Sequence, residues 1–134
     1  MEGERRERIL SNEEERIATA IVDCLFRVHS ELGPGLLESI YELCLKHELE
    51  KRSFHVERQL PVLIHYDGLV FDEGFRFDLL VGGRILCEIK SVIEMHPVFL
   101  AQTLSHLKLL DLHLGFLINF NVVRLKDGIK RVIR

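Results

Sequence analysis

Two long amphipathic segments occupy the first part of the chain. Ser11, with Glu14 three residues later, has the capping-box spacing that predicts the start of a helix. Apolar residues then recur every three or four positions and form one helical face, which consists of Ile17, Ile21, Cys24, Leu25, Val28 and Leu32. Gly33-Pro34-Gly35 ends this helix, because proline cannot continue the hydrogen-bond ladder and glycine accepts a left-handed cap. Residues 1–10, before it, are charge-rich and are predicted to be frayed.

A second helix is predicted from about residue 36 to residue 51. Its predicted inward face consists of Leu37, Ile40, Tyr41, Cys44, Leu45 and Leu49. From residue 54 the hydrophobic period changes to that of strands, and Asp67-Gly68 is a strong hairpin signal. Residues 69–81 are predicted to form the next strand, bent at Gly74, and residues 84–90 the third strand of a meander.

The last third of the chain returns to a helical period. Pro97 is typical of a first helical position and predicts a third helix. Residues 114–119 are predicted to form a buried strand, and residues 122–125 and 129–133 a terminal hairpin around Asp127-Gly128. The order is therefore helix, helix, three-strand meander, helix, strand and hairpin. Without a repeat or a linker, this order predicts a single domain over residues 11–134.

Composition narrows the class of protein. The chain has 134 residues, enough to bury a core, and its 47% hydrophobic and 29% charged residues are ordinary for a globular protein. No apolar run reaches membrane-spanning length and no signal-like segment is present, so we expect a cytosolic protein that does not enter a membrane. Three widely spaced cysteines, Cys24, Cys44 and Cys87, suit reduced thiols better than a disulfide framework.

Charge argues against one class of function. The net charge of −3 disfavours strong sequence-independent binding to DNA. The end of the chain is nevertheless basic, with Arg124, Lys126, Lys130, Arg131 and Arg134. A solvated last strand is the preferred interpretation of these residues, and a local basic patch is the alternative.

The most informative chemistry lies in the meander. Glu88 and Lys90 are two residues apart, so on a strand both side chains project from one face. Burying a carboxylate beside an ammonium is costly unless the two serve each other or an ion. Asp78 adds a second carboxylate on the preceding strand. Oxygen ligands of this kind are preferred by Mg²⁺ and Mn²⁺, so the set indicates a metal-assisted phosphodiester cleavage site.

The turn before these residues decides whether they share a face. A two-residue turn at Gly82-Gly83 would pair Asp78 with Cys87 and put Asp78 and Glu88 on opposite faces. A three-residue loop of residues 81–83, with Gly83 left-handed, would instead place Asp78 opposite Leu86 and on the face of Glu88. The catalytic hypothesis requires the three-residue loop.

These residues also carry a resemblance. The GxxExxY signature of a group of small prokaryotic proteins is matched by Gly35-Leu36-Leu37-Glu38-Ser39-Ile40-Tyr41. Asp78 followed by Glu88-Ile89-Lys90 resembles the metal-binding and catalytic core of the PD-(D/E)XK nuclease superfamily, of which that group looks like a branch. Ala101-Gln102 and the segment 117–120 resemble the later parts of the family, so the resemblance covers residues 11–133.

The resemblance implies a role for each matching residue. Asp78 and Glu88 would be the principal ligands of a Mg²⁺ or Mn²⁺ ion, with Ile89 contributing only its backbone carbonyl. Glu38 would reach the metal directly or through water. Lys90 would hold the attacking water or stabilise the pentavalent phosphate. Gln102 matches the glutamine of a QxxxY element that orients the site in related nucleases.

Four positions keep alternative interpretations. Glu38 is explained equally by a helix start, where a carboxylate favours the positive end of the helix dipole. Tyr41 is either a core aromatic with a satisfied hydroxyl or part of the site, and Gly35 is better explained as a helix-start glycine than as a substrate contact. His106 stands where the QxxxY element has tyrosine.

The resemblance implies an α/β domain of the restriction-endonuclease-like type, with a mixed central sheet flanked by helices. The preferred function is metal-dependent hydrolysis of phosphodiester bonds in DNA or RNA. The alternative is a catalytically silent interaction module of the same fold within a larger nucleic-acid-processing or defence assembly. The acidic net charge favours the module, and the intact set of Asp78, Glu88 and Lys90 favours the enzyme. Because so small a chain covers little nucleic acid, a homodimer or a protein partner is also expected.

Overall fold

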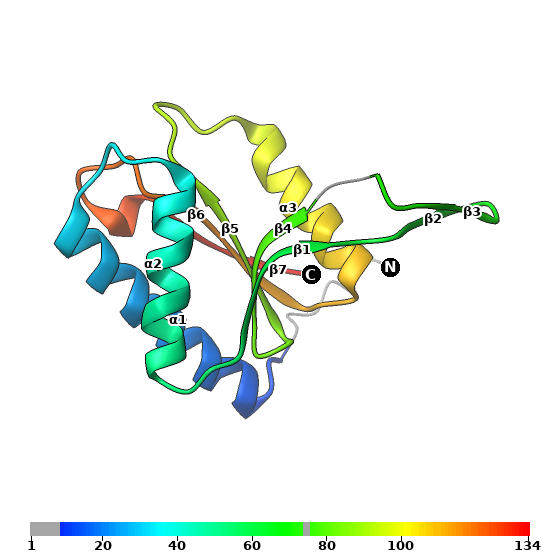
Figure 1. The fold of residues 1–134 in the computed structure, drawn as a ribbon, viewed down its shortest axis with the longest axis horizontal. Coiled ribbons are helices and arrows are strands. Elements are labelled where there is room, and N and C mark those ends of the chain that lie inside the picture. Colours follow the sequence, from blue (N-terminus) through cyan, green and yellow to red (C-terminus); the bar gives the residue numbers. More distant parts are fainter. Residues whose placement is uncertain (1–8, 74–75) are drawn as a thin grey trace.

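A five-stranded sheet with helices on both faces forms the body of the protein (Figure 1). The computed structural model describes residues 9–73 and 76–134. The helices are α1 (Asn12–Leu32), α2 (Glu38–Lys51), α3 (Pro97–Leu110) and the short 3-10 helix η2 (Leu125–Asp127). The strands are β1 (Val56–Pro61), β2 (Ile64–Tyr66), β3 (Leu69–Phe71), β4 (Arg76–Val81), β5 (Ile85–Lys90), β6 (Leu114–Asn119) and β7 (Ile129–Ile133).

The sheet is mixed. Its strand order is β1-β4-β5-β6-β7, and β5 and β6 are parallel while the other neighbours are antiparallel. The crossover between the two parallel strands contains α3, as parallel neighbours require. The predicted α/β class, with a mixed sheet flanked by helices, is confirmed.

The start of α1 confirms the capping-box prediction. The Ser11 hydroxyl accepts a hydrogen bond from the Glu14 backbone N–H at 3.0 Å, and a Glu14 carboxylate oxygen accepts one from the Ser11 N–H at 2.8 Å. The helix ends at Leu32, and Gly33 follows with φ 70°. For residues 1–8 the predicted fraying lies outside the described part of the chain.

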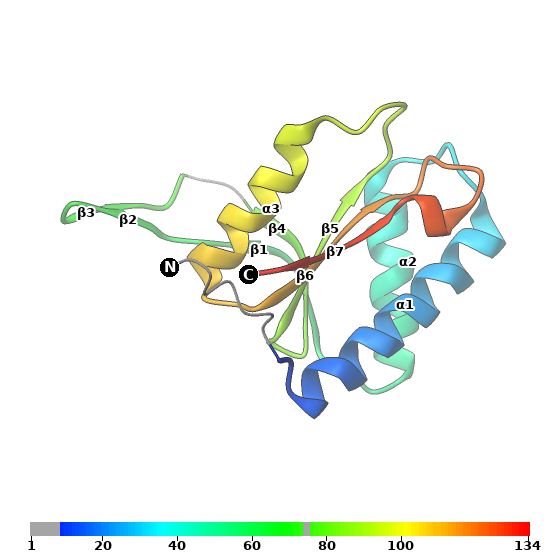
Figure 2. The same cartoon turned by 180° about the vertical axis from the view of Figure 1, so that it is seen from behind.

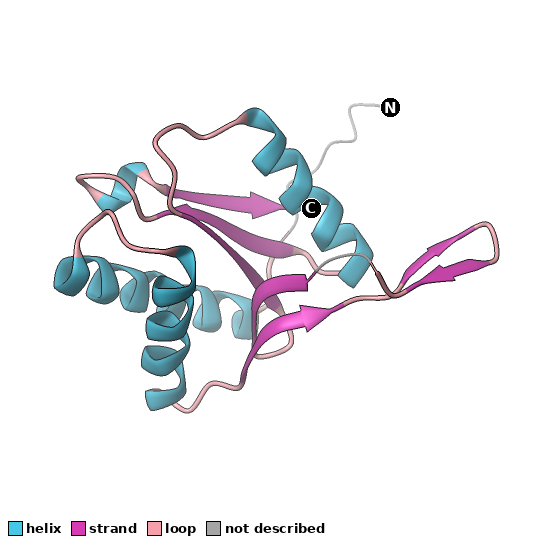
Figure 3. Cartoon of the chain, turned by 45° about the horizontal axis from the view of Figure 1, so that its top comes forward, coloured by secondary structure: helices cyan, strands magenta, loops and turns pink. Residues whose placement is uncertain are grey.

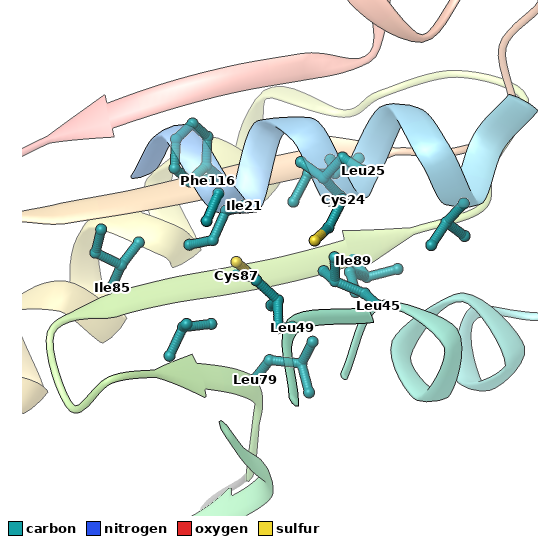
Figure 4. Packing of buried hydrophobic residues seen from close by; sticks show 14 of the residues in the cluster. Ile21, Cys24, Leu25, Leu45, Leu49, Leu79, Ile85, Cys87, Ile89 and Phe116 are labelled. Atoms are coloured by element: carbon teal, nitrogen blue, oxygen red, sulfur yellow. The ribbon is translucent and has the colours of Figure 1, made fainter. Parts of the chain in front are cut away.

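Two apolar layers sandwich the sheet. Helices α1 and α2 pack on one face and α3 on the other, as the reverse view also shows (Figure 2). Cys24 of α1 and Leu45 and Leu49 of α2 face Cys87 and Ile89 of β5 in the larger layer (Figure 4). The smaller layer joins Leu107 of α3 to the sheet residues Phe77, Leu86, Leu117 and Val132.

The inward face of α2 differs in part from the prediction. Tyr41, Leu45 and Leu49 are buried as predicted, but Leu37 and Ile40 are exposed. The helix begins only at Glu38, so Leu37 precedes it and lies at the surface. A carboxylate, Glu42, is buried in this face instead.

The predicted strand 69–81 is wrong as a single element. Strand β3 pairs only with β2, in a hairpin that projects from the body, whereas β4 pairs with β1 and β5 (Figure 3). The change occurs where Asp72 and Glu73 interrupt the apolar run, because two adjacent acids do not enter a core. The turn at Asp67-Gly68 is confirmed, with φ 49° and 82°, and the predicted bend at Gly74 lies outside the described residues.

The predicted terminal hairpin is also wrong. Residues 122–124 form no strand, and β7 pairs along the free edge of β6 instead, with Leu114 opposite Ile133. Without β7 the backbone groups of β6 on this edge would lack partners, and buried backbone groups are rarely left unpaired. Leu125, in η2, is buried in the larger apolar layer. Within the described residues, no helix combines the length and the hydropathy that crossing a membrane requires.

Candidate active site

A glycine loop joins β4 to β5. Val81 pairs with Ile85, so the loop consists of Gly82, Gly83 and Arg84. Gly82 and Gly83 have φ values of 60° and 66°, a left-handed conformation that favours glycine. The predicted three-residue length is correct, but the loop lies one residue further along the chain than predicted.

The backbone conformation suits glycine where β4 ends. Gly82 has φ 60°, and a Cβ atom there would also lie 2.9 Å from Cδ1 of Ile17, the end of a side chain that would have to shift. Leu79 pairs with Cys87, so the next opposed positions along β4 and β5 are Asp78 and Glu88. Asp78 is therefore not opposite Leu86. The prediction that Asp78 lies opposite Leu86 is wrong by two residues. Asp78 lies opposite Glu88 itself, closer to it than the predicted diagonal position.

Strands β4 and β5 part just before the two carboxylates. Leu79 and Cys87 are the last paired residues. Beyond them the Ile89 backbone N–H donates a hydrogen bond to Oδ2 of Asp78 at 2.7 Å. The Asp78 side chain thus replaces the backbone acceptor that a continued ladder would offer, which ties its carboxylate to β5.

A cavity of about 450 Å³ opens beside this gap, on the side of α3. It is lined by Arg76, Asp78, Glu88, Lys90, Phe99, Gln102, Thr103 and His106. Strands β4 and β5 supply the charged side chains, and the first three turns of α3 supply the opposite wall. The structure thus brings together four of the residues that the sequence singled out, namely Asp78, Glu88, Lys90 and Gln102.

Glu88 is held by a histidine of α3. Its carboxylate oxygen Oε1 forms a hydrogen bond with Nδ1 of His106, and Glu88 is only 6% exposed. The His106 ring also packs edge-on against Phe77, with 5.2 Å between the ring centroids. His106, which stands at the position of an expected tyrosine, therefore orients a site carboxylate.

Lys90 and Gln102 complete the charged end of the cavity. The Lys90 ammonium lies 4.5 Å from the centre of the Phe99 ring, a cation–π contact that restricts its position. Gln102 is exposed and lies one helical turn before His106, on the same wall of the cavity. An ammonium, two carboxylates and a carboxamide thus border one space.

The electrostatics of Asp78 differ from those of a surface carboxylate. Burial raises the pKa of Asp78 from its ordinary value of 3.8 to about 7, and the nearby carboxylates of Glu42 and Glu88 act in the same direction. The Ile89 N–H and the Lys90 ammonium oppose this shift without cancelling it. Burial thus outweighs these two favourable contacts, and a strongly shifted carboxylate in a cleft is typical of functional sites.

Comparison with known proteins agrees with this geometry. A family model described as the PD-(D/E)XK nuclease superfamily matches residues 15–132. The chain belongs to the PD-(D/E)XK nuclease superfamily. The mixed sheet between helices is consistent with the restriction-endonuclease-like fold. No curated protein and no solved structure gave a match.

In this PD-(D/E)XK domain, Glu38 lies outside the cavity-lining set. Its Oε2 accepts a hydrogen bond from the Ser91 backbone N–H at 3.1 Å, and the Ser91 hydroxyl donates to the Leu36 carbonyl at 2.7 Å. Ser91 directly follows Lys90, so Glu38 holds the end of β5 and the chain that leaves it. The side chain of Ile89 is fully buried, which leaves only its backbone for a role in the site.

Replacing Glu38 by glutamine separates its two interpretations. We expect Mg²⁺ affinity within about threefold of wild type and a loss of about 0.3–1 kcal/mol in stability, because the change removes a favourable charge at a helix N-terminus. Calorimetric Mg²⁺ titration and thermal melts at matched pH measure the two effects. A much weaker Mg²⁺ affinity with unchanged stability would instead make Glu38 a metal-site residue.

Tyr41 is a core residue with a satisfied hydroxyl. Its hydroxyl donates to the Gly33 carbonyl at 2.6 Å and accepts from the Leu36 N–H at 3.1 Å. Its ring stacks on Phe120, with 4.2 Å between the ring centroids. These contacts fix the loop between α1 and α2. Gly35 in that loop has φ 98°, which accounts for glycine there by backbone conformation.

The donor chemistry of the cavity fits a hard divalent cation. Asp78 and Glu88 offer carboxylate oxygens, which Mg²⁺ and Mn²⁺ prefer, and both border the same cavity. Over residues 9–73 and 76–134, no three His, Cys, Asp or Glu side chains are grouped as a metal site. Two carboxylates suffice for Mg²⁺, which usually keeps several water ligands. PD-(D/E)XK nucleases are in general divalent-metal-dependent, and these two residues suit that requirement.

The sequence pattern did not reveal Glu42 as a candidate. On the helix Glu42 lies beside Leu49, at the edge of the face that the apolar pattern assigns to the core. An acid in such a position needs a partner. Its partners lie on β1, which the sequence did not place beside this helix.

Proposed function

We propose that the protein is a divalent-metal-dependent nuclease that hydrolyses phosphodiester bonds in DNA or RNA. The observation that carries the proposal is the cavity in which Asp78, Glu88 and Lys90 meet where β4 and β5 part. Membership of a nuclease superfamily over residues 15–132 supports the same reaction class.

Asp78 and Glu88 would hold the ion, with the Ile89 carbonyl as a further oxygen donor. A bound Mg²⁺ or Mn²⁺ ion supplies a Lewis acid for the phosphate and lowers the pKa of bound water. The Ile89 N–H keeps the Asp78 carboxylate turned towards β5, and His106 keeps that of Glu88 in place. Both carboxylates are thus preorganised before an ion binds.

Lys90 would act on the phosphate. Its ammonium is a compact charge that can orient the attacking water or stabilise the negative charge that develops on the phosphoryl oxygens. The Phe99 ring holds this charge in the cavity without neutralising it, because the contact is with a ring face and not with a carboxylate. Gln102, on the facing wall, can donate a hydrogen bond to a phosphate oxygen.

The pH dependence of metal binding tests the proposal. Mg²⁺ competes with a proton for Asp78, so we expect Mg²⁺ affinity to fall by up to about tenfold per pH unit below pH 7 and to level off above it. Because folding raises this pKa, the metal-free protein should lose stability as the pH rises from about 4 to about 7. Calorimetry from about pH 5.5 to about pH 8.5 measures the first trend, and thermal melts from about pH 4 to about pH 8.5 measure the second.

Cleavage provides the second arm of this test. Single- and double-stranded DNA and RNA are each incubated with protein and Mg²⁺ or Mn²⁺, with a chelator as the control. We expect cleavage of at least one substrate, with a rate that rises up to neutral pH as metal affinity does. The absence of Mg²⁺ and Mn²⁺ binding at every pH would overturn the proposal.

The proposal has two finer parts. We propose that the chain belongs to the GxxExxY branch of the superfamily, which Gly35, Glu38 and Tyr41 support. We also propose a cytosolic setting with nucleic acid as the partner. Support for a reducing compartment comes from the three cysteines, all of which are free thiols.

A further inference from the structure

Glu42 is a buried carboxylate without a role in the proposed chemistry. It lies on α2 and is 4% exposed. Its Oε1 accepts one hydrogen bond from Nε of Arg58 at 3.0 Å and another from Nε2 of Gln59 at 2.8 Å. Both donors are on β1, so a single oxygen of the helix binds two consecutive residues of the edge strand.

A regular strand does not allow this arrangement. Consecutive side chains of a strand project to opposite faces, so Arg58 and Gln59 cannot both reach one atom while β1 stays extended. The structure resolves the conflict at Gln59, which has φ 54°. Among the described residues that are not glycine, the other positive φ values, at Ser53, Asp67 and Asp111, occur outside strands. Gln59 is thus a strained residue inside a strand, and such strain persists only where neighbouring contacts hold it.

The strained residue lies opposite Asp78. In the register of β1 and β4, Arg58 pairs with Leu79 and Leu60 pairs with Phe77. Gln59 therefore lies opposite Asp78, and the pairing of the two strands is interrupted at this position. At the same position, the side chains of β4 change from one apolar layer to the other. Leu79 belongs to the apolar layer under α1 and α2, whereas Phe77, two residues away, belongs to the layer under α3. The local twist of β1 and β4 therefore centres on Asp78.

We propose that Glu42 is a positioning residue of the candidate active site: by binding Arg58 and Gln59 it holds β1 left-handed opposite Asp78, and this releases the Asp78 carboxylate towards Ile89 and Glu88. The closeness of Glu42 to Asp78 agrees with this role, because its charge contributes to the raised pKa of Asp78. The effect of Glu42 on catalysis rests on the proposed nuclease function. Its effect on the Asp78–Ile89 hydrogen bond does not, and that bond is measurable without metal or substrate.

The first experiment replaces Gln59 by glycine and, separately, by alanine. Both variants lose the hydrogen bond to Glu42, but only glycine adopts a positive φ without strain. Hydrogen exchange of the Ile89 amide, which donates to Asp78, is measured in the metal-free full chain, together with Mg²⁺ affinity. We expect the glycine variant to stay within about threefold of wild type in both and the alanine variant to exchange at least about tenfold faster and bind Mg²⁺ more weakly.

The second experiment tests the anchor itself. Glu42→Leu should accelerate exchange of the Ile89 amide and weaken Mg²⁺ binding, whereas Glu42→Gln should stay near wild type because its carboxamide oxygen still accepts both hydrogen bonds. Adding Gln59→Gly to Glu42→Leu should restore Ile89 protection, since glycine no longer needs the anchor. Glu50→Leu is the matched control on α2, because Glu50 is exposed and forms an ion pair with Lys46 of the same helix at 2.9 Å.

The outcomes separate the two proposals. Unchanged Ile89 exchange in a folded Glu42→Leu variant would overturn the positioning role. If Glu42→Leu does not fold, equal Ile89 exchange in the alanine and glycine variants at position 59 overturns it instead. If wild type binds neither Mg²⁺ nor Mn²⁺ but the exchange pattern is as expected, the nuclease proposal fails and the positioning role stands.

Discussion

Alanine in place of Lys90 is expected to lower the rate of cleavage by at least about 10²-fold, the usual effect of removing one preorganised charge from a transition state. The fold should persist, because Lys90 is only partly buried and its described contact is with the Phe99 ring. Mg²⁺ affinity should be unchanged or slightly higher, since both carboxylates remain and a competing cation is gone. Single-turnover cleavage and calorimetric Mg²⁺ titration of the same preparations measure the two effects.

Lys51→Ala is the matched control for this variant. Lys51 is an exposed residue at the C-terminal end of α2, so its replacement removes the same charge from the face of the sheet opposite to α3 and the cavity. We expect it to cleave like wild type. Cleavage at the wild-type rate by Lys90→Ala, purified identically and free of contaminating nuclease, would refute the catalytic assignment of Lys90.

Asparagine in place of Asp78 is expected to abolish cleavage and to weaken Mg²⁺ binding by at least about tenfold, or about 1.4 kcal/mol. The carboxamide oxygen can still accept the Ile89 N–H, so the local geometry should survive. Above about pH 7 the metal-free variant should be at least as stable as wild type, because the buried, ionised carboxylate of wild type is destabilising there. Thermal melts with and without Mg²⁺ should therefore show a metal-induced rise in Tm for wild type only.

Asp23→Asn supplies the control for the loss of one carboxylate. Asp23 lies on α1 and forms an exposed ion pair with Arg52 at 3.4 Å, remote from the cavity residues of β4 and β5. The control should keep both cleavage and the Mg²⁺-dependent rise in Tm. A wild-type Mg²⁺ affinity in the Asp78 variant would show that the ion binds elsewhere.

Local signals in the sequence predicted local structure well. The Ser11–Glu14 capping box, the Asp67-Gly68 turn and the helix start at Pro97 are all confirmed. Each depends on backbone groups within a few residues, so short-range chemistry decides it. The strand spacing of Glu88 and Lys90 likewise sufficed to predict that both side chains share a face, and both line the cavity.

Pairing between distant strands was predicted less well. The sequence supplied the length of the loop at Gly82 but not its position, which is set by the register that β4 and β5 adopt within the whole sheet. It also suggested a hairpin for β7, whereas β7 completes the free edge of β6. Such choices are made by the burial of whole layers and by the pairing of all backbone groups, and the hydrophobic pattern of one segment does not contain them.

The sequence by itself determined which chemical groups the candidate site contains, because two acids and a lysine on adjoining strands are a property of residue type and spacing. Only the tertiary structure decided how those groups are held. It placed His106 against Glu88, kept Glu38 at the end of β5 and brought Glu42 to Arg58 and Gln59. The physical reason is that a buried charge takes its partners from whichever elements pack around it, and helix–sheet packing is settled only when the whole core forms.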